Sequence, residues 1–78
     1  MQHGTDIPTA PRTLFIDGSE CGEGTFVIMQ GDSEDEAGEV WGVDAFRRRV
    51  LVSWPVRVRG GYRYSQEWAN ADELKVLY

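Results

Sequence analysis

GEVWGVDAFRRRVLVSW, residues 38–54, is the stretch on which the fold of this chain depends. Its last part places Val50, Val52 and Trp54 at every second position, with leucine and serine between them. Successive side chains of a β-strand point to opposite faces of a sheet, so this alternation predicts a strand with one face in the core. We expect the other strands of the chain to be added to this one.

A shorter strand precedes it in the same stretch, with Val40 and Gly42 expected on one face and Trp41 and Val43 on the other. A turn at residues 44–45 is expected to join the two strands, because an aspartate can hydrogen-bond its own backbone two residues further on. So short a connection requires the two strands to be antiparallel neighbours. The centre of the predicted fold is therefore a β-hairpin.

Other strand-like runs lie on both sides of this hairpin. RTLFID (12–17) and TFVIMQ (25–30) precede it, and the second is apolar enough for a strand that is buried on both faces. The glycines of residues 18–24 predict a loop between them. Pro55 is expected to end the strand that contains Trp54, because proline cannot donate a hydrogen bond to the ladder. KVLY (75–78) is the predicted last strand.

The segment 56–64, VRVRGGYRY, alternates valine and tyrosine with arginine, and its two glycines predict a turn or a bulge. If the segment is one bent strand, its three arginines project from one face beside the arginines of residues 47–49. The segment 66–74 has the composition of a single helical or 3₁₀ turn before the last strand.

Length and composition favour one small domain, residues 12–78, preceded by a flexible arm at residues 1–11 that holds two of the three prolines. The core of so small a domain is expected to be compact and rich in aromatic side chains. With Cys21 as the single cysteine, no intramolecular disulfide can form, which favours a reducing, cytoplasmic setting. No run is apolar enough to span a membrane, and either a monomer or a homodimer is compatible with this size.

The net charge of −5 hides a segregation of charge along the chain. Residues 1–46 hold ten acids and one arginine, whereas residues 47–66 hold six arginines and no acid. The sequence therefore has an acidic first half, followed by a basic segment. A folded domain can bring these two parts side by side.

Five or six short strands, no long helix, an acidic loop and a turn before the last strand together indicate a small SH3-like barrel. G-E-V-W-G-V-D, R-R-V-L-V-S-W and E-W-A-N-A-D-E-L-K-V-L, in this order, resemble the SH3-like barrels of the Tudor and KOW kind. In those a G-x-V strand precedes a V-x-V-x-W strand, and a W-x-x-x-x-x-L-x-x-L segment closes the barrel. The matching positions are Gly38, Val40, Val50, Val52, Trp54, Trp68, Leu74 and Leu77.

This resemblance covers residues 25–78 and implies a domain that binds a peptide, a modified side chain or a nucleic acid rather than one that catalyses a reaction. Its positions are core and turn residues, and the sequence alone does not tell which aromatic rings face outward. No aromatic cage is therefore carried over. Fold analogy sets an expectation for the function, and the site has to be argued from its own residues.

The acidic loop 31–38 is the first candidate site, since its carboxylates could dock on a basic groove of a partner and imitate the phosphate spacing of a nucleic acid. It lacks the ligand register of a calcium-binding loop, so no metal and no cofactor are expected. The alternative is that it is a solvated loop that keeps the protein soluble. The expected partner-binding residues, including those of the basic segment, are Asp32, Glu34, Asp35, Glu36, Arg57, Arg59, Tyr62, Arg63 and Tyr64.

The arginine-rich segment is the best binding candidate in the sequence, because arginines interleaved with aromatic rings can bind phosphates or carboxylates and stack on bases. The alternative is that the arginines are solvated strand residues that neutralise the acidic loop of the same molecule. The overall acidity opposes long-range attraction of nucleic acid. The residues of this nucleic-acid hypothesis are Arg47, Arg48, Arg49, Arg57, Arg59 and Arg63.

Catalysis finds little support in the sequence. His3, the single histidine, falls in the expected arm, away from any serine or cysteine nucleophile. The acids next to Cys21 are expected to raise the pKa of its thiol, which favours a loop or core cysteine. Tryptophans left outside the core would be natural contact points for a partner. We therefore predict a non-enzymatic protein-interaction module, in one version a small phage-type inhibitor of a larger nucleic-acid-handling protein, with nucleic-acid binding as the alternative.

Overall fold

The computed structural model of this protein describes residues 10–78, so most of the expected arm at residues 1–11 lies outside the described residues. Ala10 and Pro11 are exposed and belong to no strand or helix. From residue 10 onward the chain forms seven β-strands and two 3₁₀ turns. No helix in this part of the chain is long and apolar enough to cross a membrane.

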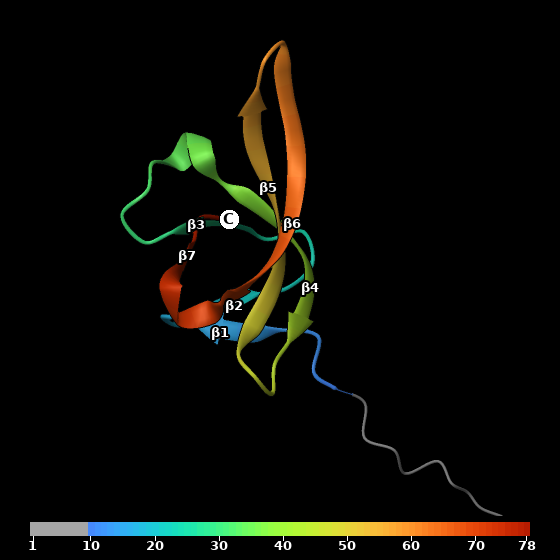
Figure 1. Cartoon of the computed structure of the whole chain (residues 1–78). Helices are drawn as coiled ribbons and strands as arrows, with labels where there is room; N and C mark the ends of the chain where they lie inside the picture. The colour runs from blue at the N-terminus through green and yellow to red at the C-terminus, as the bar shows by residue number, and fades with distance from the viewer. Residues whose placement is uncertain (1–9) are drawn as a thin grey trace, which may run out of the picture.

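The strands form two antiparallel sheets (Figure 1). A small hairpin pairs β1 (Leu14–Ile16) with β2 (Ser19–Cys21). The larger sheet has the order β6-β5-β4-β3-β7. Its strands are β3 (Phe26–Met29), β4 (Gly38–Asp44), β5 (Arg49–Val58), β6 (Gly61–Asn70) and β7 (Leu74–Val76). The 3₁₀ turn η1 (Glu34–Glu36) precedes β4, and η2 (Ala71–Glu73) precedes β7.

The prediction of a small all-β domain is confirmed. The larger sheet is open: β6 and β7 are its two edges and do not pair with each other within residues 10–78. Closure into a barrel is therefore not seen. One prediction between the first strands is wrong, because residues 18–24 are not all loop: Cys21 of β2 pairs with Leu14 of β1.

The central hairpin of β4 and β5 forms as expected, with one difference. The register shifts between Val40 and Gly42, so Trp41 is the extra residue of a β-bulge. Val40 is buried and Val43 also packs against the core, whereas Trp41 is 51% exposed. The predicted alternation, which placed Val43 on the same face as Trp41, is wrong because a bulge reverses the parity of the residues that follow it.

The turn between β4 and β5 is longer than predicted. Asp44 pairs with Arg49, so the connection consists of the four residues 45–48 rather than of residues 44–45. The Asp44 carboxylate accepts a hydrogen bond from the backbone N–H of Arg47, 3.2 Å away, three residues further on and not two. Arg48 closes the turn with a left-handed backbone conformation, φ +52°.

Pro55 does not end β5, which continues to Val58. The last pair between β4 and β5 is Glu39 with Ser53, so beyond that point β6 is the only neighbour of β5 in the described part of the chain. A proline is tolerated where a strand has an open side, because no ladder hydrogen bond is required there. The β5–β6 hairpin thus extends past the rest of the sheet (Figure 1).

The tight turn of this hairpin consists of Arg59 and Gly60, and Gly61 begins β6. Both glycines have positive φ, and the turn decides against the expected bent strand. After the turn, β6 continues to Asn70. Only Ala71–Glu73 is a 3₁₀ turn, so the helical turn predicted over residues 66–74 is mostly strand. The alternation of side chains in β6 is masked by its exposure, because polar and aromatic residues occupy both faces.

The core is aliphatic, contrary to the expectation of an aromatic one. Its largest fully buried side chains are Leu74, Val27, Val40, Val50, Val52 and Cys21. The aromatic side chains lie mostly outside, with Trp41 and Trp68 each 51% exposed. The buried side chains of the core come from β1, β2, β3, β4, β5 and β7 and from Ala71 of η2, and none of them is aromatic.

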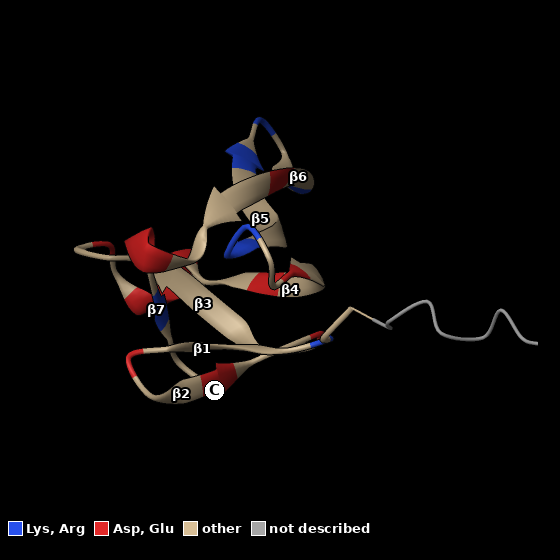
Figure 2. Ribbon diagram, turned by 90° about the horizontal axis from the view of Figure 1, so that it is seen from below, with Lys and Arg blue, Asp and Glu red and all other residues tan. Residues whose placement is uncertain are grey.

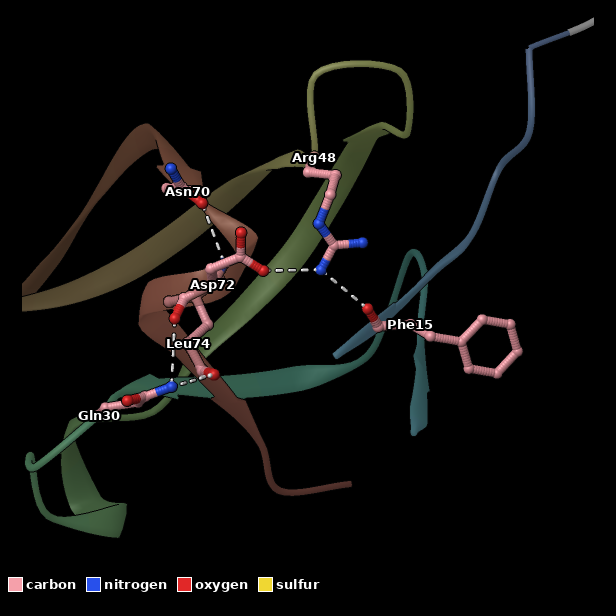
Figure 3. Close-up of polar contacts among 6 residues, drawn as sticks. All are labelled: Phe15, Gln30, Arg48, Asn70, Asp72 and Leu74. Atoms are coloured by element: carbon pink, nitrogen blue, oxygen red, sulfur yellow. Dashed lines mark hydrogen bonds and ion pairs between the residues drawn. The ribbon is translucent and has the colours of Figure 1, made fainter. Parts of the chain in front are cut away.

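Arg48 ties three parts of the chain together (Figure 3). One nitrogen of its guanidinium group donates to the Asp72 carboxylate in η2, 2.8 Å away, and to the backbone carbonyl of Phe15 in β1, 3.1 Å away. The Arg48 carbonyl accepts from the N–H of Ala71 at 2.8 Å. The Asn70 side chain caps η2 by accepting from the N–H of Asp72.

We expect Arg48→Ala to lower the free energy of unfolding by at most about 1 kcal/mol, because both partners of the ion pair are solvent-exposed. The loss should shrink in high salt, which screens the exposed pair. Urea unfolding followed by tryptophan fluorescence measures it, with Arg59→Ala as the control that removes an arginine from the hairpin turn. A loss of several kcal/mol, or an equal loss for Arg59→Ala, would contradict this account of the contact.

Candidate functional site

A groove of about 780 Å³ lies between the acidic loop and the β5–β6 hairpin. Its floor is formed by Met29 of β3, Trp54 of β5 and Ala69 of β6, which are half-buried and pack against the core. The loop that leads from β3 to β4, including η1, forms one wall. The other wall comes from the hairpin and from the end of β6 with η2.

The groove is strongly acidic. Among residues 10–78 it is lined by five carboxylates and one guanidinium group, that of Arg57. Three of the acids come from the loop and the other two from β6 and η2: Asp32, Asp35, Glu36, Glu67 and Glu73. Like charges drawn together around a concave surface raise the local potential and attract groups of the opposite sign. The lining of the groove therefore favours groups of positive charge.

Local contacts keep the acidic wall ionised. Asp35 accepts a hydrogen bond from the Ser33 hydroxyl at 2.8 Å. This bond lowers the pKa of the Asp35 carboxyl below its usual value, with further contributions from the Asp35 backbone N–H and from the positive charge of Arg57. The Asp35 carboxylate thus stays charged at neutral pH and below.

Arg57 is held on the opposite wall by Tyr62, its cross-strand partner. Its guanidinium group donates to the Tyr62 hydroxyl at 3.1 Å and lies 5.6 Å from the ring centroid, within the range of a cation–π contact. The hydrogen bond to Tyr62 and the charge of Asp35 raise the pKa of Arg57 above its usual value. Arg57 therefore neutralises a small part of the negative charge of the five carboxylates, and most of this charge remains uncompensated.

Aromatic rings border the acids. Trp54 is half-buried in the floor, and Trp68 and Tyr62 are 51% and 61% exposed. Trp68 already carries the guanidinium group of Arg49 at 5.6 Å from its ring centroid, which demonstrates that its face suits a cation. Carboxylates beside tryptophan and tyrosine rings give a site in which a lysine or arginine side chain finds both an ion pair and an apolar surface.

The structure brings together five of the nine residues expected to bind a partner, namely Asp32, Asp35, Glu36, Arg57 and Tyr62. Glu34 belongs to η1 but does not line the groove. Arg59 lies in the hairpin turn and Arg63 on β6, also outside the groove lining. Tyr64 lines a smaller hollow, near Trp41 and Phe26.

Sequence reasoning missed the other lining residues, among them the aromatic and acidic ones, Trp54, Glu67, Trp68 and Glu73. The two tryptophans were assigned to core and closure positions, and the two acids to a helical turn. The side chains of β6 show no alternation that could have found Glu67, which is placed by the pairing of β6 with β5, directly opposite Val52. Glu73 could be placed only after the route of the chain through η2 was known.

The six arginines do not form one continuous ribbon. Arg47, Arg48 and Arg49 lie in or beside the turn that begins β5, whereas Arg57, Arg59 and Arg63 lie around its other end. Figure 2 shows the basic residues at these two separate places, the β4–β5 turn and the hairpin tip. A strand of ten residues is roughly 30 Å long, so the two groups cannot contact one short ligand together.

The first of these groups is neutralised within the molecule, though not by the acidic loop. Arg47 and Arg49 lie 3.1 Å and 3.7 Å from the same carboxylate oxygen of Asp44. Arg48 pairs with Asp72. The arginines of residues 47–49 are therefore paired with Asp44 and Asp72, and not with the acidic loop as the predicted alternative required.

The ion pairs of Asp44 with Arg47 and Arg49 make the stability of the protein dependent on pH. Hydrogen bonds from the side chain and backbone of Arg47 lower the pKa of the Asp44 carboxyl. A carboxyl whose pKa is lower in the folded state contributes stability above its unfolded pKa, and the contribution is lost as the pH falls through the folded value. We expect Asp44→Asn to be less stable than the natural protein at pH 7 and to approach it below pH about 3. Urea midpoints measured across this pH range test the prediction, and a difference that does not change with pH would contradict it.

Cys21 is fully buried, and burial raises the pKa of its thiol. The predicted direction of this shift agrees, but its cause is burial and not the neighbouring acids. His3 lies outside the described residues. Within residues 10–78 no group of three or more histidine, cysteine, aspartate or glutamate side chains is placed to hold a metal ion.

The groove thus offers charge and apolar surface for binding a cationic chain. Its lining residues supply carboxylates, rings and one guanidinium group that is already hydrogen-bonded to Tyr62. Comparisons of the chain with protein-family models, with curated proteins and with solved structures found no match.

Proposed function

We propose that this protein is a non-enzymatic interaction module whose groove binds a basic segment of another protein. The observation that carries the proposal is the convergence of five carboxylates from the acidic loop, β6 and η2 on one concave surface that also contains two tryptophans. Each lysine or arginine of the segment would exchange its hydration shell for a carboxylate and a ring face.

The size of the groove supports a segment rather than a small ion. A volume of about 780 Å³ accommodates several side chains, and the groove is open at the surface, so an extended chain can lie along it. The most strongly desolvated contact would be made on Trp54, since its ring is half-buried among Met29 and Ala69. Buried aromatic residues of this kind usually dominate the energetics of an interface.

A finer proposal concerns the fold and the partner. The order β6-β5-β4-β3-β7, with a 3₁₀ turn before a last strand that pairs with β3, supports an SH3-like arrangement. Basic segments are typical of proteins that handle nucleic acids. A small acidic protein that binds such a segment would block its contact with phosphates, as expected of an inhibitor of the phage type in the cytoplasm.

The direct test is titration with a fluorescein-labelled peptide in which lysine and arginine alternate with alanine, followed by anisotropy at low and moderate salt. We expect saturable binding that weakens with salt, because part of the attraction is electrostatic. A peptide of the same length with glutamate in place of the basic residues is the control. No binding of the basic peptide even at low salt would contradict the proposal.

Nucleic-acid binding by the arginines is the second candidate. The observation in its favour is that Arg59 and Arg63 make no side-chain hydrogen bond or ion pair among residues 10–78. It predicts that a labelled single-stranded oligonucleotide binds with a steep salt dependence and that Arg59→Ala with Arg63→Ala weakens the binding. An oligonucleotide that binds more tightly than the basic peptide would favour this candidate over the groove.

A further inference from the structure

The outer edge of β6 is a long strand edge without a partner. β6 has ten residues, almost all of them exposed, and among residues 10–78 β5 is its only neighbour in the sheet. Apart from its ladder with β5, no backbone group of β6 is hydrogen-bonded within residues 10–78. Such an edge presents a row of free N–H and C=O groups and is a template for pairing with another strand.

We propose that the strand that covers this edge is β6 of a second copy, paired antiparallel about a two-fold axis at Ser65. In this register Arg63 of each copy lies opposite Glu67 of the other. Tyr62 lies opposite Trp68. Opposite charges and aromatic pairs that face each other across two antiparallel strands stabilise the pairing.

The sequence of β6 selects this register among its neighbours. In the two neighbouring registers that keep the same face of both sheets on one side, the two-fold axis lies at Tyr64 or at Gln66. With the axis at Tyr64, Arg63 faces Ser65 and Glu67 faces Gly61. With the axis at Gln66, Glu67 faces Ser65. Only the axis at Ser65 gives both charged residues an opposite charge.

The charged side chains of β6 also determine which strands can pair with it. Charged side chains on an edge strand ordinarily discourage pairing with other strands. Arg63 and Glu67 impose this cost on any strand that does not supply the complementary charges. A second copy supplies both, because a two-fold interface brings the same pair of residues together twice. The edge of β6 therefore favours pairing with β6 of a second copy. The two five-stranded sheets would then form one continuous sheet.

Disulfide cross-linking tests the register. At a two-fold axis, the two copies of the central residue have Cα atoms about 4.5–5.5 Å apart, within the range that a disulfide spans. We expect Ser65→Cys to form a covalent dimer readily on mild oxidation, and Tyr64→Cys and Gln66→Cys to do so at least about tenfold more slowly. Cys21 is buried and does not compete. Equal cross-linking at the three positions, or none at residue 65, would overturn the proposed register.

Charge exchange tests the contact itself, with the dimerisation constant measured by sedimentation equilibrium. Arg63→Glu and Glu67→Arg each place like charges opposite one another twice, and each should weaken the dimer about tenfold. The double variant restores opposite charges and should return to within about threefold of the natural protein. Arg59→Glu, in the hairpin turn, is the control. A protein that stays monomeric at millimolar concentration, or a double variant no better than the single ones, would refute the proposal.

Discussion

Glu36→Lys is expected to weaken binding of the basic peptide about 30-fold, because it replaces an attractive carboxylate in the groove by a repulsive ammonium group. Glu36 lies in η1, on the acidic wall of the groove. Adding Asp32→Lys on the same wall should raise the loss to more than about 100-fold. Both residues are exposed, so the free energy of unfolding should change by less than about 0.5 kcal/mol.

The matched control is Glu34→Lys, two residues earlier in the same 3₁₀ turn. It changes the net charge of the protein by the same amount, but Glu34 does not line the groove. We expect a loss of no more than about threefold, from the weaker long-range field alone. Equal losses for Glu34→Lys and Glu36→Lys would mean that net charge, and not the groove, attracts the peptide.

Gly38→Ala is expected to lower the free energy of unfolding by about 3 kcal/mol, a large fraction of the stability of so small a domain. A Cβ at residue 38 would lie 2.5 Å from a methyl carbon of Val52, 2.7 Å from the Trp54 ring and 3.0 Å from the Ser53 carbonyl oxygen. These atoms belong to the paired strand β5 and to its core face, so they cannot move aside without separating β4 from β5. The Trp54 ring would also be displaced from the floor of the groove.

Gly42→Ala is the matched control, in the same strand. A Cβ there meets only the Cβ of Leu51, at the ordinary contact distance of 3.6 Å. We expect a change of less than about 1 kcal/mol, in either direction. Urea unfolding of the two variants checks the pair of predictions. Similar losses at residues 38 and 42 would contradict the close approach of β4 to β5.

The central hairpin could be predicted from the sequence because its cause is local. Val50 and Val52 alternate with less buried residues, and the structure buries both of them. The same logic failed at Trp41, because the bulge that reverses the alternation there depends on the pairing of two strands. The prediction that Pro55 ends the strand failed for a related reason. Pro55 lies beyond the last pair of β5 with β4, and where that pairing stops depends on where β4 begins.

The acidic wall of the groove could be predicted for a similar reason: Asp32, Asp35 and Glu36 are close in sequence. The rest of the groove depends on long-range pairing. Glu67 joins the site only because β6 folds back along β5. β5 is ten residues long and separates the arginines near residue 48 from those near residue 59, although the sequence places all of them in one basic segment. Residues that are near each other in sequence along a strand can lie far apart in space.

The central claim is that a basic segment binds in the groove, and the three tryptophans of the chain test it directly. Trp54 and Trp68 line the groove, whereas Trp41 lines the separate hollow near Phe26. The measurement is a ¹H–¹⁵N correlation spectrum of the indole N–H groups during titration with the basic peptide. We predict saturable shifts of the Trp54 and Trp68 indole signals with the Trp41 signal unmoved. A titration that moves the Trp41 signal and leaves the other two in place would contradict the account.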